Sequence, residues 1–500
     1  MDGGGWRVPL VVPTASGRIR GRREAGLTAW RGVPFTAPPV GPLRLRAPVP
    51  PEPWAGVREA AADGPLPPQP RTSTLTGAGL RTPTSEDCLT LSVVRRTAGD
   101  APKPVVVFVY GGAYGIGGAS AGAYRGETLA ATGDVVFVGF NYRLGALGWL
   151  DLSAYGDDEH PIDTNLGLRD QLAALAWVRA NIAAFGGDPH DVTLAGESAG
   201  ATSVLTLMTM PAARGLFDRA IAESPAIASV HNADRSAGWA AELVDELPGG
   251  AAALRTIDAD ALVGATLRLD VAVSDRQPAA RVLGPVVDGD LLPDYPVEVL
   301  RRGEALPVPL IIGTNADEGT LFQRMRALRA TPVRLERLFD ATVPEAKEPV
   351  LAAYAGGRRP RDLERFVTDL MFWAPSVEAA AGHAAVAPVW MYRFDFAPPA
   401  SRALRLGAAH SFELDHVLAR RDGFTRRVAT ALGGGRAARA LTLRMSSAWL
   451  AFARTGSAPD WWPPFDAVTR RTWVFDRVDR LEGDPRPDVR SVWRSWRPYG

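Results

Sequence analysis

Short apolar runs alternate along this chain with longer segments of helical periodicity. The runs lie at 104–112, 134–145, 192–196 and 308–315 and are rich in β-branched and aromatic residues. An uninterrupted apolar run of this length is typical of a strand buried on both faces. Strands that alternate with helices predict an α/β fold with a mostly parallel central sheet and helices on both of its faces.

The helical segments and the breaks between them outline a single unit. Apolar residues recur at helical spacing over 168–185, and the pattern over 201–210 predicts a second helix. Residues 32–56 are too rich in proline for a helix interior or a central strand. From roughly 230 to 390 the chain is mostly helical in pattern. Because no long linker interrupts it, we expect one domain over 1–500, with 230–390 as a helix-rich insertion region.

Charge and composition exclude several kinds of partner and mechanism. The 500 residues carry a formal net charge of +1, which favours neither nucleic acid nor a membrane surface as a partner. Lys103 and Lys347 are the only lysines, and neither belongs to a phosphate-binding loop or to an S-x-x-K motif. The N-terminal residues do not resemble a secretory signal, and the apolar runs are too short to span a bilayer. Cys88 is the only cysteine, so no internal disulfide can form. We expect a cytoplasmic protein.

The pattern Gly-x-Ser-x-Gly, typical of a nucleophilic serine on a sharp strand-to-helix turn, occurs twice. "GESAG" at 196–200 follows the apolar run "DVTLA" and precedes a helical pattern, which is the context that the motif requires. "GASAG" at 118–122 follows "GGAYGIGG", which is too rich in glycine to be a strand. We therefore interpret Ser198 as the nucleophile and Ser120 as a loop serine.

A nucleophilic serine needs a histidine base with an acid behind it, in the chain order Ser, acid, His for this kind of turn. The first three of the six histidines lie too early for that order. His383 lies in a helical pattern typical of a packed or solvent-facing imidazole. His410 and His416 share the loop-like stretch "LGAAHSFELDHVLA". Their spacing of six does not align them on one helix face, so we predict no metal site there.

Several longer stretches, taken together, are far more specific than the short motif. They include "RGVPFTAPPVGPLRLRAP", "SEDCLTLSV", "VVVFVYGGAYGIG", "NYRLGALGWL", "DPHDVTLAGESAG", "GTNADEGTLF" and "GAAHSFELDHVL". With them the chain resembles the type-B carboxylesterase/lipase family, which also contains the cholinesterases, and within it the bacterial carboxylesterases. The resemblance runs nearly from end to end and implies an α/β-hydrolase fold.

The resemblance also implies a catalytic triad. Ser198 would be the nucleophile, Glu318 in "DEG" the acid and His410 in "GAAHSFEL" the base, while His416 would be a partly buried structural histidine. Ser224 in "AIAESPA" matches a serine that hydrogen-bonds near the triad, although Pro225 follows it where the family usually has glycine.

The backbone N–H groups of Gly112, Ala113 and Ala199 would form the oxyanion hole. The family usually has a glycine at the position of Ala113, and a methyl group there is expected to narrow the pocket. Leu321 and Phe322 match two adjacent phenylalanines that line the cholinesterase gorge. Cys88 matches a disulfide cysteine whose upstream partner is missing, so packing alone is expected to hold the loop at 65–86.

These features together predict a serine carboxylesterase that cleaves neutral esters of short- to medium-chain acids through an acyl-enzyme, without a cofactor. Residues 71–87 contain no aromatic ring that could bind a choline cation. The same triad could act on a carbamate, amide or thioester, and the chain could also be a binding protein without catalysis. Activity is expected to fall below about pH 6.5 as the imidazole protonates. The oligomeric state stays open.

Overall fold

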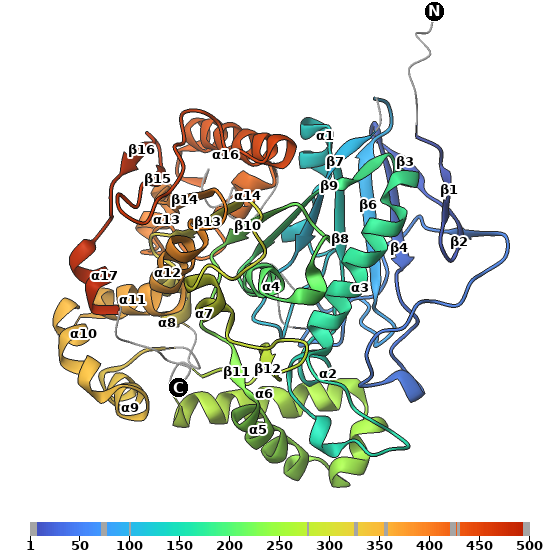
Figure 1. The fold of residues 1–500 in the computed structure, drawn as a ribbon, viewed down its shortest axis with the longest axis horizontal. Helices are drawn as coiled ribbons and strands as arrows, with labels where there is room; N and C mark the ends of the chain where they lie inside the picture. Colours follow the sequence, from blue (N-terminus) through green and yellow to red (C-terminus); the bar gives the residue numbers. More distant parts are fainter. Residues whose placement is uncertain are drawn as a thin grey trace, which may run out of the picture.

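A large, mostly parallel sheet forms the centre of the protein (Figure 1). The computed structural model describes residues 8–71, 78–99, 102–277, 280–324, 329–354, 359–420, 427 and 431–493. The sheet has 11 strands in the order β16-β15-β14-β13-β10-β9-β7-β8-β6-β4-β3. Its parallel part comprises β8 (Val136–Phe140), β7 (Lys103–Val109), β9 (Gly187–Glu197), β10 (Arg219–Glu223), β13 (Leu310–Asn315), β14 (Val389–Phe394) and β15 (Thr472–Phe475).

Antiparallel strands close both edges of this sheet. They are β16 (Arg480–Glu482) on one side and β6 (Thr90–Arg96), β4 (Leu27–Pro34) and β3 (Arg22–Glu24) on the other. The apolar runs at 104–112, 134–145, 192–196 and 308–315 contain or overlap β7, β8, β9 and β13, as the sequence predicts. Val105–Val109 are all buried, because helices cover the parallel strands on both faces.

Helices form a layer on each face of the sheet. α1 (Glu127–Gly133) and α16 (Gly435–Thr455) pack together on one face, over β7 and its neighbours. α3 (Leu166–Asn181), α4 (Ala199–Met208) and α12 (Ala374–His383) cover the other. All ten residues of α4 are buried, so the helix that follows Ser198 is held rigidly. The α/β-hydrolase fold predicted from the sequence is confirmed.

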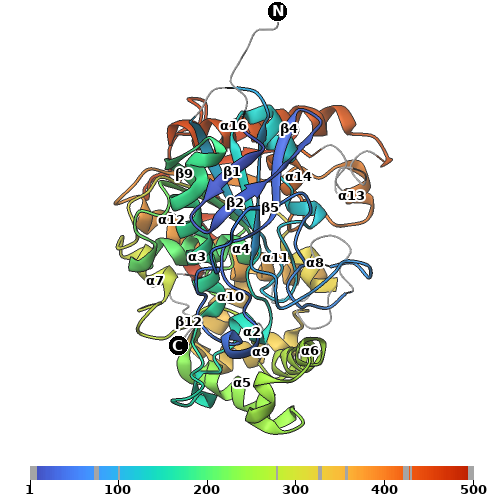
Figure 2. The same cartoon turned by 90° about the vertical axis from the view of Figure 1, so that its right-hand side faces the viewer.

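The N-terminal residues add a small separate sheet at one side of the molecule. It consists of β1 (Val11–Thr14), β2 (Gly17–Arg20) and β5 (Val57–Glu59) (Figure 2). Most of the proline-rich stretch 32–56 is irregular, with only the end of β4 and one short 3-10 turn at Gly41–Leu43.

The helix-rich region is divided by a central strand. Its helices are α5 (Ala233–Glu246), α6 (Ala259–Arg276), α7 (Pro296–Arg301), α8 (Gly319–Arg324), α9 (Pro332–Ala341), α10 (Lys347–Ala353), α11 (Pro360–Thr368) and α12. β13 runs between α7 and α8 in the middle of the sheet. Residues 230–390 therefore comprise two helical excursions, one before and one after β13, rather than a single insertion.

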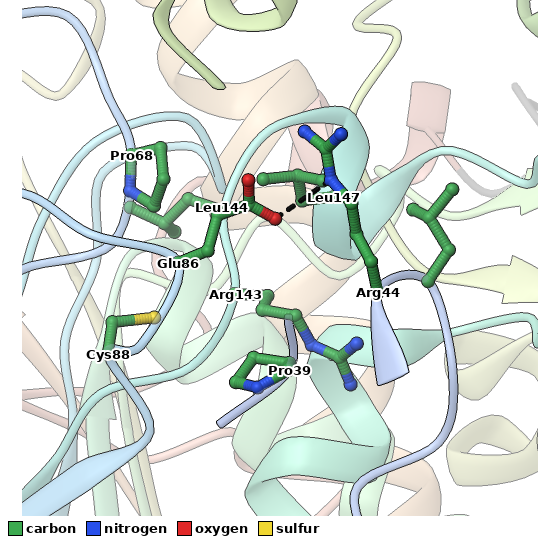
Figure 3. Close-up of a pocket in the computed structure, with 9 residues that line it drawn as sticks. Pro39, Arg44, Pro68, Glu86, Cys88, Arg143, Leu144 and Leu147 are labelled. Carbon is green, nitrogen blue, oxygen red and sulfur yellow. Dashed lines mark ion pairs between the residues drawn. The ribbon is translucent and has the colours of Figure 1, made fainter. Parts of the chain in front are cut away.

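Polar contacts as well as packing hold the described parts of the loop at 65–86. The Gln69 amide accepts from the N–H groups of Ala78 and Gly117, at 3.0 and 2.9 Å. Figure 3 shows Arg44 reaching Glu86 beside the buried Cys88, with an N–O distance of 2.8 Å. The expectation that packing alone holds this loop is therefore wrong, because an ion pair and a buried amide also contribute. No helix in the described part of the chain has the length and apolar character needed to cross a membrane.

Candidate active site

Ser198 lies on a tight turn between the end of β9 and the start of α4. Its backbone is strained, with φ 57° and ψ −123°. The two glycines of the motif make this turn possible. A Cβ atom on Gly196 would lie 2.7 Å from the carbonyl carbon of Gly200, and one on Gly200 would lie 2.0 Å from the carbonyl oxygen of Val109. Only glycine fits at either position. The motif therefore forms the sharp strand-to-helix turn that the sequence predicts at 196–200.

The structure brings Ser198, His410 and Glu318 together into one hydrogen-bonded chain. His410 Nε2 lies 2.9 Å from Ser198 Oγ, and His410 Nδ1 lies 2.6 Å from Glu318 Oε2. The other carboxylate oxygen of Glu318 accepts from the backbone N–H of Asn315 at 2.7 Å. Glu318 is fully buried and His410 is 8% exposed. The arrangement can remove a proton from the serine and hold the resulting imidazolium against a fixed carboxylate.

Asp317, the neighbour of Glu318, and His416, the second histidine of the loop, both point elsewhere. Asp317 accepts from the backbone N–H of Ala408 at 2.9 Å, so its carboxylate faces the loop before His410 and not the imidazole. His416 Nδ1 lies 2.9 Å from Thr442 Oγ1, between the rings of Phe394 and Phe396.

Ser120 lies in a turn, and its carbonyl accepts from Arg125 Nε at 3.0 Å. It is followed by a 3-10 turn at Gly122–Tyr124 rather than by an α-helix. The strand before the serine and the α-helix directly after it, which distinguish "GESAG" from "GASAG" in the sequence, are therefore also found in the structure only at Ser198.

The loop after β7 passes directly beside Ser198. A Cβ atom on Gly111 would lie 2.8 Å from Ser198 Cβ, so the backbone here is in close contact with the serine. Gly112 has φ 120° and Ala113 has φ 51°. Among the described residues, none accepts a hydrogen bond from the N–H of Gly112 or Ala113. Ala199 is the first residue of α4, where the helix leaves its N–H groups without intrahelical acceptors. These three N–H groups could stabilise negative charge next to Ser198.

Ser224, at the end of β10, does not touch the triad itself. Its Oγ donates to Glu413 Oε1 at 3.4 Å. Asn315 Nδ2 donates to the other oxygen of Glu413, and the backbone N–H of Asn315 binds Glu318. Ser224 therefore reaches the triad through two intermediate residues.

Two aromatic rings flank the imidazole. The ring centroid of Phe322, on α8, lies 5.1 Å from that of His410, and the ring of Phe372 lies 4.8 Å from it. The two phenylalanines are stacked on each other at 5.5 Å. Leu321 is partly buried against the core next to Phe322. Phe372 is absent from the sequence prediction because it lies in a helical stretch with no motif around it.

Four buried glutamates lie in or next to this site: Glu197, Glu318 and Glu413 act electrostatically on His410, and Glu223 lies near Glu413. Glu197, the variable residue of the serine motif, lies 3.3 Å from His410 Nε2 and accepts from Ser411 Oγ. Burial raises the pKa of Glu197, and it raises the pKa of Glu413 to about 8 with the help of the neighbouring carboxylates. Sequence reasoning missed both, although they lie within the motifs that contain Ser198 and His410.

The carboxylates around His410 predict a shifted pH profile. Burial lowers the pKa of His410, but the charges of Glu318 and Glu197 outweigh it and raise this pKa to about 9. Since only the neutral imidazole accepts the serine proton, the fall in kcat/KM toward acid should have its midpoint above pH 6.5, the ordinary value for histidine. Glu197→Gln should lower this midpoint, because it removes a negative charge next to Nε2. A wild-type midpoint at or below pH 6.5, or one that Glu197→Gln leaves unchanged, would contradict this prediction.

Glu223 predicts a measurable effect on stability. Trp449 Nε1 donates to its Oε1 at 2.8 Å, and burial raises its pKa well above the usual value. The pKa of the Glu223 carboxyl group is higher in the folded state than in the unfolded state, so the folded state holds this proton more tightly. The resulting stability is fully present below the unfolded-state pKa and is lost as the pH rises toward the folded-state pKa. Glu223→Gln keeps the acceptor for Trp449 but has no proton to lose. Its free energy of unfolding relative to wild type should rise with pH above the ordinary carboxyl pKa, by at most about 1.4 kcal/mol per pH unit. Urea unfolding at pH 6, 7 and 8 measures this, and a pH-independent difference would refute it.

Comparisons with known proteins agree with this geometry. A model described as "Carboxylesterase family" matches residues 8–473. The chain is 37% identical over 497 residues to the para-nitrobenzyl esterase of Bacillus subtilis, covering 96% of this chain and 98% of that protein. It is 33% identical over 498 residues to the phenmedipham hydrolase of Pseudarthrobacter oxydans, with the same two coverages of 96% and 98%.

Solved structures give the same result. A PNB esterase superposes with a TM-score of 0.86 at 36% identity, covering 96% of this chain and 99% of that one. A carboxylesterase of Geobacillus stearothermophilus superposes with a TM-score of 0.83 at 34% identity, covering 97% and 100%. Since these matches extend almost from end to end, the chain belongs to the carboxylesterase family and is a carboxylic ester hydrolase of the serine type.

Proposed function

We propose that this carboxylesterase hydrolyses neutral esters of short- to medium-chain acids, with Ser198 as nucleophile, His410 as base and Glu318 as the acid that orients the base. The observation that carries the proposal is the pair of short contacts at His410, 2.9 Å to Ser198 Oγ and 2.6 Å to Glu318 Oε2. Nucleophile, base and orienting acid are the parts that acyl transfer requires.

In the first half of the proposed reaction, Ser198 Oγ attacks the ester carbonyl while its proton passes to His410 Nε2. His410 Nδ1–H donates to Glu318 throughout, so the imidazolium forms beside a carboxylate that is already in position. The oxyanion accepts from the N–H groups of Gly112, Ala113 and Ala199. Collapse breaks the ester bond, and the alcohol leaves with the proton from Nε2. Water then repeats the sequence on the acyl-enzyme and releases the acid.

The preference for neutral esters is proposed from the side chains around the site. Phe322 and Phe372 give the imidazole apolar neighbours, and residues 71–87 contain no aromatic residue to bind a quaternary ammonium group. An apolar pocket discriminates by size, at about 1–3 kcal/mol per methylene group that does or does not fit. The acyl chain length should therefore affect kcat/KM.

The test is a series of p-nitrophenyl esters from acetate to palmitate, with butyrylcholine as the charged control. We expect the highest kcat/KM between acetate and octanoate, and at least tenfold less for butyrylcholine than for p-nitrophenyl butyrate, which corresponds to about 1.4 kcal/mol. Palmitate above butyrate, or butyrylcholine equal to p-nitrophenyl butyrate, would refute the substrate class and leave the triad intact.

A carbamate, an amide and a thioester complete the panel. One relative makes them necessary, since a protein that matches this chain almost from end to end is named a phenmedipham hydrolase. A higher kcat/KM on one of these than on every ester would reassign the substrate. If no substrate of the whole panel, esters included, shows turnover that depends on Ser198, the result would favour a binding protein without catalysis.

A further inference from the structure

One turn of the helical layer touches His410 and directly follows a residue that binds the neighbour of Glu318. It is the π-helical turn η10 (Asp369–Trp373), which joins α11 to α12. Pro375, in the first turn of α12, has no N–H and would clash with the carbonyl of Met371 in a regular α-helix, so the wider turn accommodates its ring. A π-helical turn is frequently found at a functional site.

Two contacts connect this turn to the triad. Directly before it, the last residue of α11, Thr368, accepts at Oγ1 from the backbone N–H of Gly319, at 2.9 Å, and Gly319 directly follows Glu318. There is no space between α8 and α11, the helix that continues into η10, since a Cβ atom on Gly319 would lie 2.1 Å from the carbonyl oxygen of Glu364 on α11. At its end, Phe372 packs against the imidazole of His410. A small shift of η10 would therefore move both the acid and the base.

An ion pair between a half-exposed arginine near the C-terminal end of the chain and a buried carboxylate fixes η10. Asp369 is fully buried, and Arg486 donates to both of its carboxylate oxygens at 2.7 and 2.6 Å. Tyr354 O–H donates to the same carboxylate, and Trp493 Nε1 donates to the Tyr354 oxygen at 2.8 Å. The Arg486 guanidinium also lies over the ring of Trp373, 4.8 Å from its centroid.

The backbone of Arg486 is itself strained, with φ 57°, a conformation that non-glycine residues adopt rarely. Its successor Pro487 begins α17 (Pro487–Trp493), which packs on α10 and supplies Trp493. Surrounding structure must hold such a conformation in place, and here the bidentate contact to Asp369 does so. The guanidinium of Arg486 therefore links α17, which lies beside α10 in Figure 1, to the turn beside the triad.

We propose that Arg486 and Asp369 are positioning residues of the ester hydrolysis, acting through η10 on His410 and Glu318. They touch neither substrate nor reacting atoms, and the inference rests on the proposed function of the triad. Because Phe372 belongs to the same turn, the ion pair also sets the aromatic surface next to the imidazole. A misplacement of about 1 Å in such machinery can cost about a hundredfold in rate.

The test compares Arg486→Met with a matched variant, Arg444→Met. Arg444 makes the same kind of bidentate contact, to Asp479 at 2.7 and 2.8 Å, and its side chain is 34% exposed against 36% for Arg486. Arg444 lies on α16, and among the described residues its side chain forms hydrogen bonds and ion pairs with Asp476 and Asp479 and with no residue of η10. Both variants are measured for melting temperature, kcat, KM and the pH midpoint of kcat/KM on p-nitrophenyl butyrate, well below their melting temperatures.

We expect Arg486→Met to lower kcat about ten- to a hundredfold, with KM within about twofold, and to shift the pH midpoint. Arg444→Met should lower the melting temperature with kcat and the pH midpoint unchanged. Arg486→Lys, which keeps the charge without the bidentate geometry, should lie between Arg486→Met and wild type. Tyr354→Phe removes one hydrogen bond from Asp369 and should give a smaller fall in kcat even if Arg486→Met does not fold.

Equal behaviour of Arg486→Met and Arg444→Met, with kcat and pH midpoint unchanged in both, would overturn the proposal. So would an unchanged kcat in Tyr354→Phe if the arginine variant cannot be purified. Failure of the proposed function gives a different result, namely a wild-type protein with no turnover that depends on Ser198.

Discussion

Ser198→Ala should lower kcat for ester hydrolysis by about 10⁶-fold, because it removes the only hydroxyl group in the described site within hydrogen-bond reach of His410 Nε2. The loss should appear in kcat with little change in KM, since alanine leaves the surrounding pocket in place. The residual rate should still exceed that in water, because the oxyanion-hole N–H groups do not depend on the side chain of residue 198.

The matched control is Ser120→Ala, which changes the serine of the other Gly-x-Ser-x-Gly motif. Its carbonyl accepts from Arg125, a contact that the substitution preserves. We expect kcat within about twofold of wild type, since surface and loop substitutions of this kind usually have small effects. A folded Ser120→Ala protein without turnover, beside an active Ser198→Ala protein, would reverse the assignment of the nucleophile.

The second large effect is expected at Glu318. Glu318→Gln should lower kcat by about 10³- to 10⁴-fold, because an amide cannot stabilise the imidazolium and can bind the wrong tautomer of His410. Asp317→Asn should stay within about tenfold of wild type. Its side chain faces the N–H of Ala408, and the asparagine oxygen can still accept that hydrogen bond.

The two histidines form a parallel pair of variants. His410→Ala should resemble Ser198→Ala in kcat, whereas His416→Ala should mainly affect stability, because His416 contacts Thr442 and two phenylalanines away from the triad. Circular dichroism and the melting temperature show whether each variant is folded. If Asp317→Asn and Glu318→Gln lose kcat equally while both are folded, the acid of the triad is not Glu318.

Much of the fold, and the strand–turn–helix context of Ser198, could be predicted from local sequence. Strand patterns such as 104–112 depend on short-range periodicity, which is present in the chain itself. Ser198 could be distinguished from Ser120 because the strand before it and the helix after it are both local features. His410 could not be separated from His416 on local grounds, since the two lie in the same loop-like stretch. That choice came from the family resemblance, and the hydrogen bond to Ser198 agrees with it.

The rest of the site depends on contacts between distant parts of the chain. Arg486 and Asp369 lie 117 positions apart, and no pattern around either one indicates the other. The buried Glu223 and Glu413 are likewise hidden from sequence reasoning, because glutamate is normally a surface residue and only the folded packing shows that these are enclosed. The π-helical turn at Asp369–Trp373 was also not predicted, since helical periodicity over this stretch does not distinguish it from a regular helix.

Covalent labelling tests the central claim most directly. The wild-type protein is treated with an organophosphate that transfers a phosphoryl group to an activated serine, and the modified peptide is identified by mass spectrometry. We predict one adduct per chain, located on Ser198, and labelling that slows as the pH falls because His410 must be neutral to accept the serine proton. Equimolar labelling of Ser120 or of another residue, or no labelling of a folded protein that hydrolyses esters, would contradict the account.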